Sequence, residues 1–237
     1  DEVILLSPYY FNHEMAIALA SAVPVPVPAD ERLQPDLPAI EAAITERTRA
    51  IVTVSPNNPT GAVYPRETLA AIHRLCAKRR IYHVSDEAYE YFTYDGARHF
   101  SPGSLGGEHV ISLYSLSKAY GMASWRVGFL VAPEHLHRDL MKIQDTVVVS
   151  GSAISQFVGL HAMREGRGYC GAHLPSLARV RKEVLARIEA VPDLVKVPPA
   201  TGAFYLFAKV NTEMSAIALA ERLVREHKVA VIPGETF

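Results

Sequence analysis

The sequence predicts an α/β fold, in which a mostly parallel sheet is flanked by helices and followed by part of a smaller α+β unit. Two observations support this prediction. Short apolar runs alternate with longer helix-like segments up to Pro133, a pattern typical of parallel strands joined by helices. Beyond Pro133 the alternation stops and long helix-like segments dominate, which indicates a change of architecture.

The individual elements follow from the apolar runs and the turn residues between them. Strands are expected at residues 3–7, 23–27, 50–55, 81–85, 110–115 and 127–132. Helices are expected at residues 11–22, 35–45 and 65–80. Pro65 fits the first turn of the third helix, as Pro133 fits that of the next. Pro24 to Pro28 alternates proline with valine, which favours an edge strand or a connector.

The part after Pro133 is expected to be rich in helices. These are predicted at residues 134–148, 152–164, 175–190 and 212–227. Short strands are predicted near residues 195–197, 203–208 and 229–232. The smaller unit lies within this helix-rich part, and we place the domain boundary near residues 167–171. The predicted domains are a large one over residues 1–168 and a small one over residues 169–237.

Composition narrows the classes of function. Hydrophobic residues make up 49% of the chain and charged residues 21%, as in globular proteins, and the formal net charge is −1. Such a charge gives no basic surface for nucleic acid or an anionic membrane, and no apolar run approaches the roughly 18 residues of a membrane span. The spacings of the ten histidines and of Cys76 and Cys170 match no metal motif. Free thiols are expected, consistent with a reducing cytosol.

Lys118 is the most informative residue for function. It follows the predicted strand 110–115, and ligands of open α/β sheets bind beyond the carboxyl ends of strands. Ser115 and Ser117 offer hydroxyls, and Arg126 offers a planar guanidinium that matches phosphate oxygens. An unprotonated amine condenses with an aldehyde, and a lysine in an enclosed pocket loses its proton more readily. An isolated lysine is usually an ordinary surface residue, because lysine is rarely fully buried, and it is the flanking residues that favour a functional role for Lys118.

Three residues upstream complete a set that suits pyridoxal phosphate. Asp86 ends the predicted strand 81–85 and would keep a pyridine nitrogen protonated, although turns and helix caps also favour aspartate. The phenol of Tyr89 would donate to the cofactor's ring oxygen, with core packing as the alternative. Asn58 lies in an Asn-Pro-Thr-Gly turn that would hold its amide still for the same ring oxygen, and this motif is also an ordinary turn signal.

Three segments, SPNNPTG, SDEAY and SLSKAYGMASWRVGF, resemble the signatures of the class I/II aminotransferase family of fold-type I pyridoxal-phosphate enzymes, the family of aspartate aminotransferase. The resemblance extends along nearly the whole chain. It implies that Lys118 is the Schiff-base lysine and proton shuttle and that Asp86 pairs with the pyridine nitrogen. The implied catalytic residues are Lys118, Asp86 and Tyr89. The implied cofactor-binding residues are Tyr10, which would stack on the ring, and Asn58, Asp86, Tyr89, Ser115, Ser117, Lys118 and Arg126.

The chain departs from the family pattern in two respects. Ser124 stands where the family usually has a glycine-like residue two positions before the arginine. The family's N-terminal phosphate-binding helix and C-terminal carboxylate-binding arginine have no counterpart in this sequence. We therefore expect the chain to be an internal fragment of a longer enzyme.

The resemblance implies transamination between an L-amino acid and a 2-oxo acid, by a ping-pong mechanism, in a cytoplasmic homodimer that serves amino acid metabolism. Two alternatives use the same cofactor residues. One is a β-lyase or synthase of the same fold. The other is the aminotransferase-like effector domain of a transcription regulator, with a DNA-binding module elsewhere in the protein.

Overall fold

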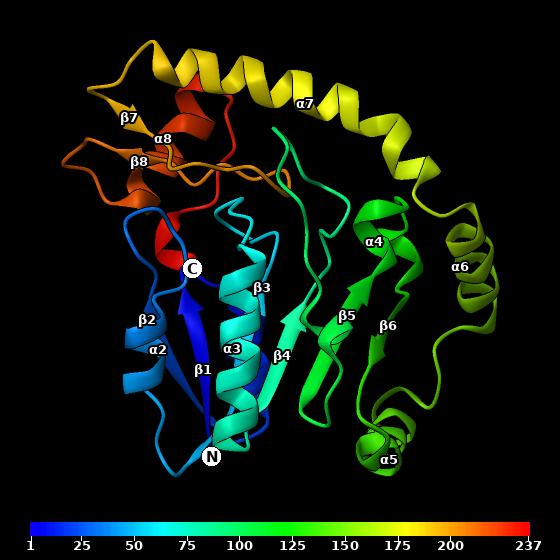
Figure 1. The fold of residues 1–237 in the computed structure, drawn as a ribbon. Coiled ribbons are helices and arrows are strands. Elements are labelled where there is room, and N and C mark those ends of the chain that lie inside the picture. Colours follow the sequence, from blue (N-terminus) through cyan, green and yellow to red (C-terminus); the bar gives the residue numbers. More distant parts are fainter.

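The computed structural model describes residues 1–237 and contains a six-stranded sheet with the order β2-β1-β3-β4-β5-β6 (Figure 1). All neighbouring strands are parallel except β5 and β6, which are antiparallel. The strands are β1 (Glu2–Ser7), β2 (Val23–Pro28), β3 (Thr48–Val54), β4 (Tyr82–Asp86), β5 (Val110–Ser115) and β6 (Gly128–Val131). The predicted fold class is confirmed, and β2 is the expected edge strand.

Helices cover both faces of this sheet because alternate residues of each strand point to opposite faces. On one face, Ile4 and Ile51 pack with Leu69 and Ile72 of the helix α3. On the other face, Leu5 packs with Ile17 of the helix α1. The helices of this part are α1 (Phe11–Leu19), α2 (Leu37–Ala42), α3 (Arg66–Arg79) and the single turn α4 (Leu116–Ala119), with 3-10 turns at Pro102–Leu105 and Ala123–Trp125.

The remainder of the chain is mainly helical. It contains α5 (His137–Val148), α6 (Ala153–Glu165), α7 (Gly168–Glu189) and α8 (Ala216–His227), a two-stranded antiparallel sheet of β7 (Val195–Lys196) and β8 (Lys209–Val210), and 3-10 turns at Glu134–Leu136 and Gly234–Thr236. In Figure 1 the long helix α7 crosses above the carboxyl ends of the strands, and α8 lies beyond the end of β1. This helical part therefore lies over the carboxyl ends of the strands.

The predicted helix start at Pro175 is wrong. The helix α7 begins at Gly168 and carries Pro175 in its interior. Proline there forfeits one backbone hydrogen bond. Packing offsets that loss, because Cys170 is buried in a cluster with Tyr89 and Phe92, and Leu174 packs against the same cluster. The first turns of α7 are therefore held by tertiary contacts that local propensity does not reveal.

Two predicted strands are also wrong. In residues 203–208, Ala203 has a φ of +51°, and its N–H donates to the Phe92 carbonyl at 2.9 Å. That segment therefore follows the loop after β4 and joins no sheet. Residues 229–232 form no strand, and Ile232 is exposed. Strand-forming residues need a partner for their backbone groups, and no strand of residues 1–237 pairs with this segment.

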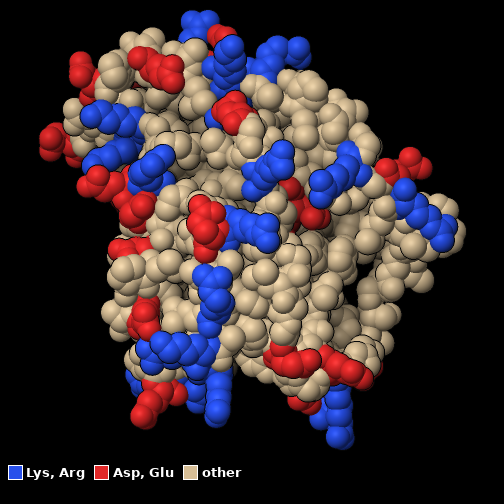
Figure 2. All heavy atoms as spheres, viewed as in Figure 1, with Lys and Arg blue, Asp and Glu red and all other residues tan.

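The surface and the cysteines agree with the composition. Figure 2 shows Lys and Arg interspersed with Asp and Glu on one face of the molecule. Cys76 and Cys170 are both buried and unpaired. None of the helices combines the length and the apolar character that crossing a bilayer requires.

Candidate active site

The carboxyl ends of β3, β4 and β5 meet at the floor of a cavity of about 890 Å³. Strand register brings them together, because Val54 pairs with Asp86 and Asp86 pairs with Leu113. All the predicted site residues line this cavity: Tyr10, Asn58, Asp86, Tyr89, Ser115, Ser117, Lys118 and Arg126. The structure thus brings residues that lie more than one hundred positions apart in the sequence, such as Tyr10 and Arg126, to one cavity.

Lys118 is presented by the short helix α4, directly after β5. The Ser115 side chain caps this helix and accepts a hydrogen bond from the Ser117 N–H at 3.2 Å. Leu116 and Ala119 are buried and anchor the turn. The Lys118 side chain is exposed and faces both the main cavity and a smaller one of about 400 Å³. The enclosed surroundings expected for this lysine are therefore not found in this chain.

Asp86 is held by two hydrogen bonds. Its Oδ1 accepts from the Ala88 N–H at 3.0 Å, and its Oδ2 lies 3.0 Å from His13 Nε2. The first bond is typical of an aspartate in a turn, so the alternative prediction of a turn aspartate is correct. The same side chain also lines the cavity. The carboxylate is thereby oriented by a backbone N–H of the turn after β4 and by a side chain of α1.

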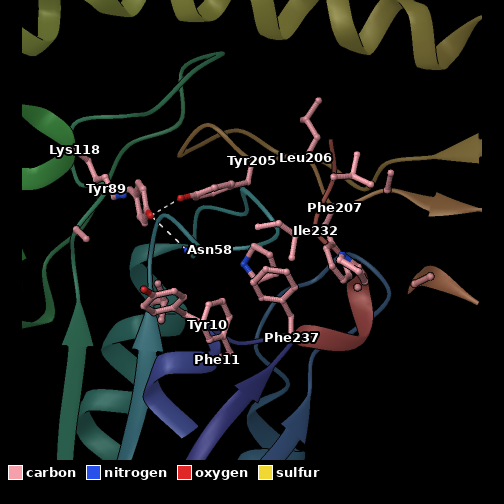
Figure 3. Close-up of a pocket in the computed structure, with 18 of the residues that line it drawn as sticks. Tyr10, Phe11, Asn58, Tyr89, Lys118, Tyr205, Leu206, Phe207, Ile232 and Phe237 are labelled. Carbon is pink, nitrogen blue, oxygen red and sulfur yellow. Dashed lines mark hydrogen bonds between the residues drawn. The ribbon is translucent and has the colours of Figure 1, made fainter. Parts of the chain in front are cut away.

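Asn58 and Tyr89 converge at one point of the cavity. Asn58 Nδ2 donates to the Tyr89 hydroxyl at 3.4 Å, and this hydroxyl lies 2.6 Å from that of Tyr205 (Figure 3). Burial, followed by the contact with Tyr205, raises the pKa of Tyr89. The phenol therefore stays protonated at neutral pH and is available as a hydrogen-bond donor.

Hydrogen bonds within the turn hold the backbone that carries Asn58. Asn57 Oδ1 accepts from the Thr60 N–H at 3.0 Å and from the Thr60 hydroxyl at 2.8 Å. Gly61 closes the turn with a φ of +72°, and a Cβ there would lie 2.7 Å from the Tyr205 carbonyl oxygen. The prediction that this turn presents the amide agrees with its geometry.

Ser115, Ser117 and Arg126 form the polar wall beside Lys118. Arg126 donates from Nη1 to the Ala123 carbonyl at 2.8 Å, which leaves its other donors free. Ser115 pairs with Gly128 across β5 and β6, and a Cβ on Gly128 would lie 2.6 Å from the Tyr114 carbonyl oxygen. Close pairing of these strands therefore brings Arg126 near Ser115.

Two of three consecutive aromatic residues face the cavity. Tyr10 and Phe11 line it, whereas the Tyr9 ring packs beside Leu5. The Tyr10 hydroxyl accepts from Asn12 Nδ2 at 2.6 Å, which ties the side chain to the start of α1. Tyr10 therefore lies on the wall of the cavity, with Phe11 beside it at a centroid distance of 5.1 Å.

The chain matches the family described as aminotransferase class I and II over residues 1–237. It belongs to this family. Its sequence is 37% identical to a probable aspartate/prephenate aminotransferase of Thermus aquaticus and 34% identical to aromatic-amino-acid aminotransferase 2 of Thermococcus litoralis. Each alignment covers all of this chain and 62% of the relative, so the chain spans less than two thirds of their length.

Solved structures show the same relationship. A double mutant of Thermus thermophilus aspartate aminotransferase superposes with a TM-score of 0.94 at 36% identity, over all of this chain and 62% of the other. An aromatic aminotransferase from Pyrococcus horikoshii superposes with a TM-score of 0.94 at 30% identity, over all of this chain and 65% of the other. The predicted family and fold are confirmed.

Pyridoxal phosphate is the cofactor of this aminotransferase family, and the residues of the cavity fit it. The cavity offers an amine for the aldehyde, a carboxylate for the ring nitrogen and an amide with a phenol for the ring oxygen. Two hydroxyls and a guanidinium remain for the phosphate. The donor set therefore matches the cofactor group by group.

Two residues of this candidate site were missed by sequence reasoning. His13 lies one helical turn after Tyr10, so this spacing could have suggested a shared face, but its contact with Asp86 spans 73 positions. Tyr205 contacts Tyr89 across 116 positions. No local pattern marks Tyr205, since its place depends on packing between Gly202 and the turn at Gly61.

Proposed function

We propose that the protein is a pyridoxal-phosphate-dependent aminotransferase that moves an amino group between an L-amino acid and a 2-oxo acid by a ping-pong mechanism. One observation carries this proposal: Lys118, Asp86 and the Asn58–Tyr89 pair line one cavity at the carboxyl ends of β3, β4 and β5. The relatives named above are aminotransferases, and none of them favours the lyase, synthase or regulator alternatives.

Lys118 and Asp86 carry the central roles in this proposal. When bound, the cofactor supplies an electron sink that stabilises charge at the substrate α-carbon. Lys118 Nζ would hold the cofactor covalently and then, once released, take and return the α-proton as a general base and acid. Asp86, oriented by His13 and the Ala88 N–H, would keep the proton on the ring nitrogen.

The remaining residues would bind and orient the cofactor. Asn58 and Tyr89 would donate to the ring oxygen. Tyr10 would stack on the ring, which limits its rotation. The phosphate would be held by Ser115, Ser117 and Arg126, with the guanidinium as the only positive charge of the three.

Substrates, assembly and domains belong to the same proposal. Aspartate, prephenate and aromatic amino acids are the first substrates to assay, since the names of the relatives contain them. A homodimer in the cytoplasm is proposed from the family resemblance and from the two unpaired cysteines. A large domain over residues 1–168 and a small domain over residues 169–237 are proposed because the long helix α7 begins at this point.

The test is the variant Lys118→Ala, with Lys182→Ala as a control on the exposed surface of α7. Loss of a proton-transfer group costs about 10²–10⁴-fold, and loss of the covalent link adds to this. We expect Lys118→Ala to lose transamination while the control keeps it. Normal turnover of Lys118→Ala would contradict the proposal. Sustained multiple turnover of the amino acid by the wild type with no 2-oxo acid added would contradict it as well.

A further inference from the structure

The contact between Tyr89 and Tyr205 points to a role for Tyr205. We infer that Tyr205 is a positioning residue that donates its hydroxyl proton to Tyr89 and thereby directs the Tyr89 proton toward the cofactor's ring oxygen. This inference rests on the proposed function, because it requires a bound cofactor. It assigns a second tyrosine, remote in sequence from all the signature segments, to the same hydrogen-bond chain.

The hydrogen-bond capacity of the Tyr89 hydroxyl limits how its proton can be used. A tyrosine hydroxyl has one proton to donate and accepts up to two hydrogen bonds. The Asn58 amide nitrogen can only donate, and it lies 3.4 Å from the Tyr89 oxygen. If Tyr205 also donates, both acceptor positions of Tyr89 are filled and its proton remains for the cavity. If Tyr205 accepts instead, the only proton of Tyr89 is used in that bond.

Both hydroxyls keep their protons at neutral pH. Tyr89 is 5% exposed and Tyr205 is half-buried, and burial is the largest cause that raises the pKa of each. The pair therefore shares two protons, one of which must lie between the oxygens at their separation of 2.6 Å. An acceptor in the cavity, such as the cofactor's ring oxygen, favours the arrangement in which Tyr205 donates.

The backbone around Tyr205 leaves this side chain little freedom. Gly202 N–H donates to the Gly61 carbonyl at 2.8 Å, and a Cβ on Gly202 would lie 2.6 Å from Pro56 Cβ and from Val63 Cγ2. The segment before Tyr205 is therefore pressed against the turn that carries Asn58. The Tyr205 ring also meets the Tyr89 ring edge-on, at a centroid distance of 5.4 Å and an angle of 81°. Phenylalanine at this position would keep these contacts and lose only the hydroxyl.

The consequence is a chain of donors that ends at the cofactor. A hydroxyl that accepts hydrogen bonds donates more strongly, so donation by Tyr205 strengthens donation by Tyr89. Strong donation to the ring oxygen stabilises its negative charge, which lowers the pH at which the bound chromophore loses its proton. Removal of the Tyr205 hydroxyl should therefore move that midpoint upward.

The test is a pH titration of the visible absorption of the holoprotein. Tyr205→Phe should raise the midpoint by about 0.5–1 pH unit, the size expected for one neutral hydrogen bond. The matched control is Tyr82→Phe, which removes a hydroxyl bonded to His135 Nε2 at 2.9 Å, at the other end of β4. The control should titrate like the wild type.

A double-mutant cycle shows whether Tyr205 acts through Tyr89. Tyr89→Phe should raise the midpoint by itself, and addition of Tyr205→Phe to that variant should change it no further. An equal shift in both backgrounds would overturn the inference, as would a wild-type midpoint in Tyr205→Phe. If the wild type forms no visible chromophore with the cofactor, the proposed function fails and the inference with it. A chromophore with an unshifted Tyr205→Phe midpoint defeats only the inference.

Discussion

His13 Nε2 lies 3.0 Å from Asp86 Oδ2, so a residue of the first turn of α1 orients the carboxylate at the end of β4. Both side chains are largely shielded, with exposed fractions of 17% and 16%. Helix α1 also carries Tyr10 at its N-terminus, and the two rings meet edge-on at 5.6 Å. One helix start therefore places both the proposed stacking ring and the support for the proposed ring-nitrogen partner.

The first prediction follows from this pair. We expect His13→Ala to weaken cofactor binding by about tenfold, because hydrogen bonds to charged groups contribute about 1.5–3 kcal/mol and Asp86 keeps its bond from the Ala88 N–H. The measurement is the cofactor dissociation constant by visible absorption. His137→Ala, exposed at the start of α5, serves as the control. An unchanged constant in His13→Ala would show that the pair does not support the site.

The second prediction concerns the contact that positions Tyr205. In Gly202→Ala the new methyl group would overlap Pro56 and Val63, each 2.6 Å away. Overpacking of this kind costs about 1–3 kcal/mol, so the free energy of unfolding should fall by that amount and cofactor binding should weaken. Urea denaturation measures the first effect.

Gly171→Ala is the matched control for this experiment. Gly171 lies within α7, and a Cβ there meets no atom within 4 Å. Alanine in a helix interior is favoured over glycine by about 0.5–1 kcal/mol, so this variant should be slightly more stable than the wild type. Equal stability of the two glycine variants would argue against the close packing at Gly202.

The third prediction concerns three neighbouring histidines away from the cavity. His83 is fully buried, and its Nε2 lies 2.9 Å from Thr53 Oγ1. Burial, with His73 and His109 nearby, lowers the pKa of His83 to about 3. As the pH falls below about 6.5, His83 therefore becomes protonated in the unfolded state but stays neutral in the folded state. His83 contributes stability above pH 6.5, and this contribution is lost as the pH falls toward 3.

We expect the free energy of unfolding to decrease by about 2 kcal/mol between pH 6.5 and pH 5 through His83 alone. Denaturation curves at several pH values measure the slope. His83→Gln should flatten it, even though the variant is less stable at pH 7.5, whereas the exposed His227→Gln should keep the wild-type slope. The same slope in His83→Gln would mean that other groups cause the acid sensitivity.

The sequence alone predicted the sheet well because its strands are short apolar runs bounded by turn residues. The strand at residues 110–115 was predicted with the bounds that β5 has. Each predicted site residue then followed a strand end or lay in a turn, and the carboxyl ends of parallel strands lie at one edge of the sheet. Local patterns and one topological rule were therefore enough to bring Lys118 and Asp86 together.

The failures share a physical cause, since each depended on a distant partner. A helix was predicted to start at Pro175, but α7 begins at Gly168, and its first turns are held by the burial of Cys170. Ala203 belongs to an apolar run, yet its backbone bonds to Phe92 rather than to a strand. His13 and Tyr205 became visible only once the fold had placed them beside Asp86 and Tyr89.

The most direct test of the central claim is the attachment site of the cofactor. The full-length protein is incubated with pyridoxal phosphate and reduced with borohydride, and the modified peptide is mapped. The proposed function predicts label on Lys118, because Lys118 Nζ is the amine that shares the cavity with Asp86, Asn58 and Tyr89. Label spread over surface lysines with none on Lys118 would contradict it.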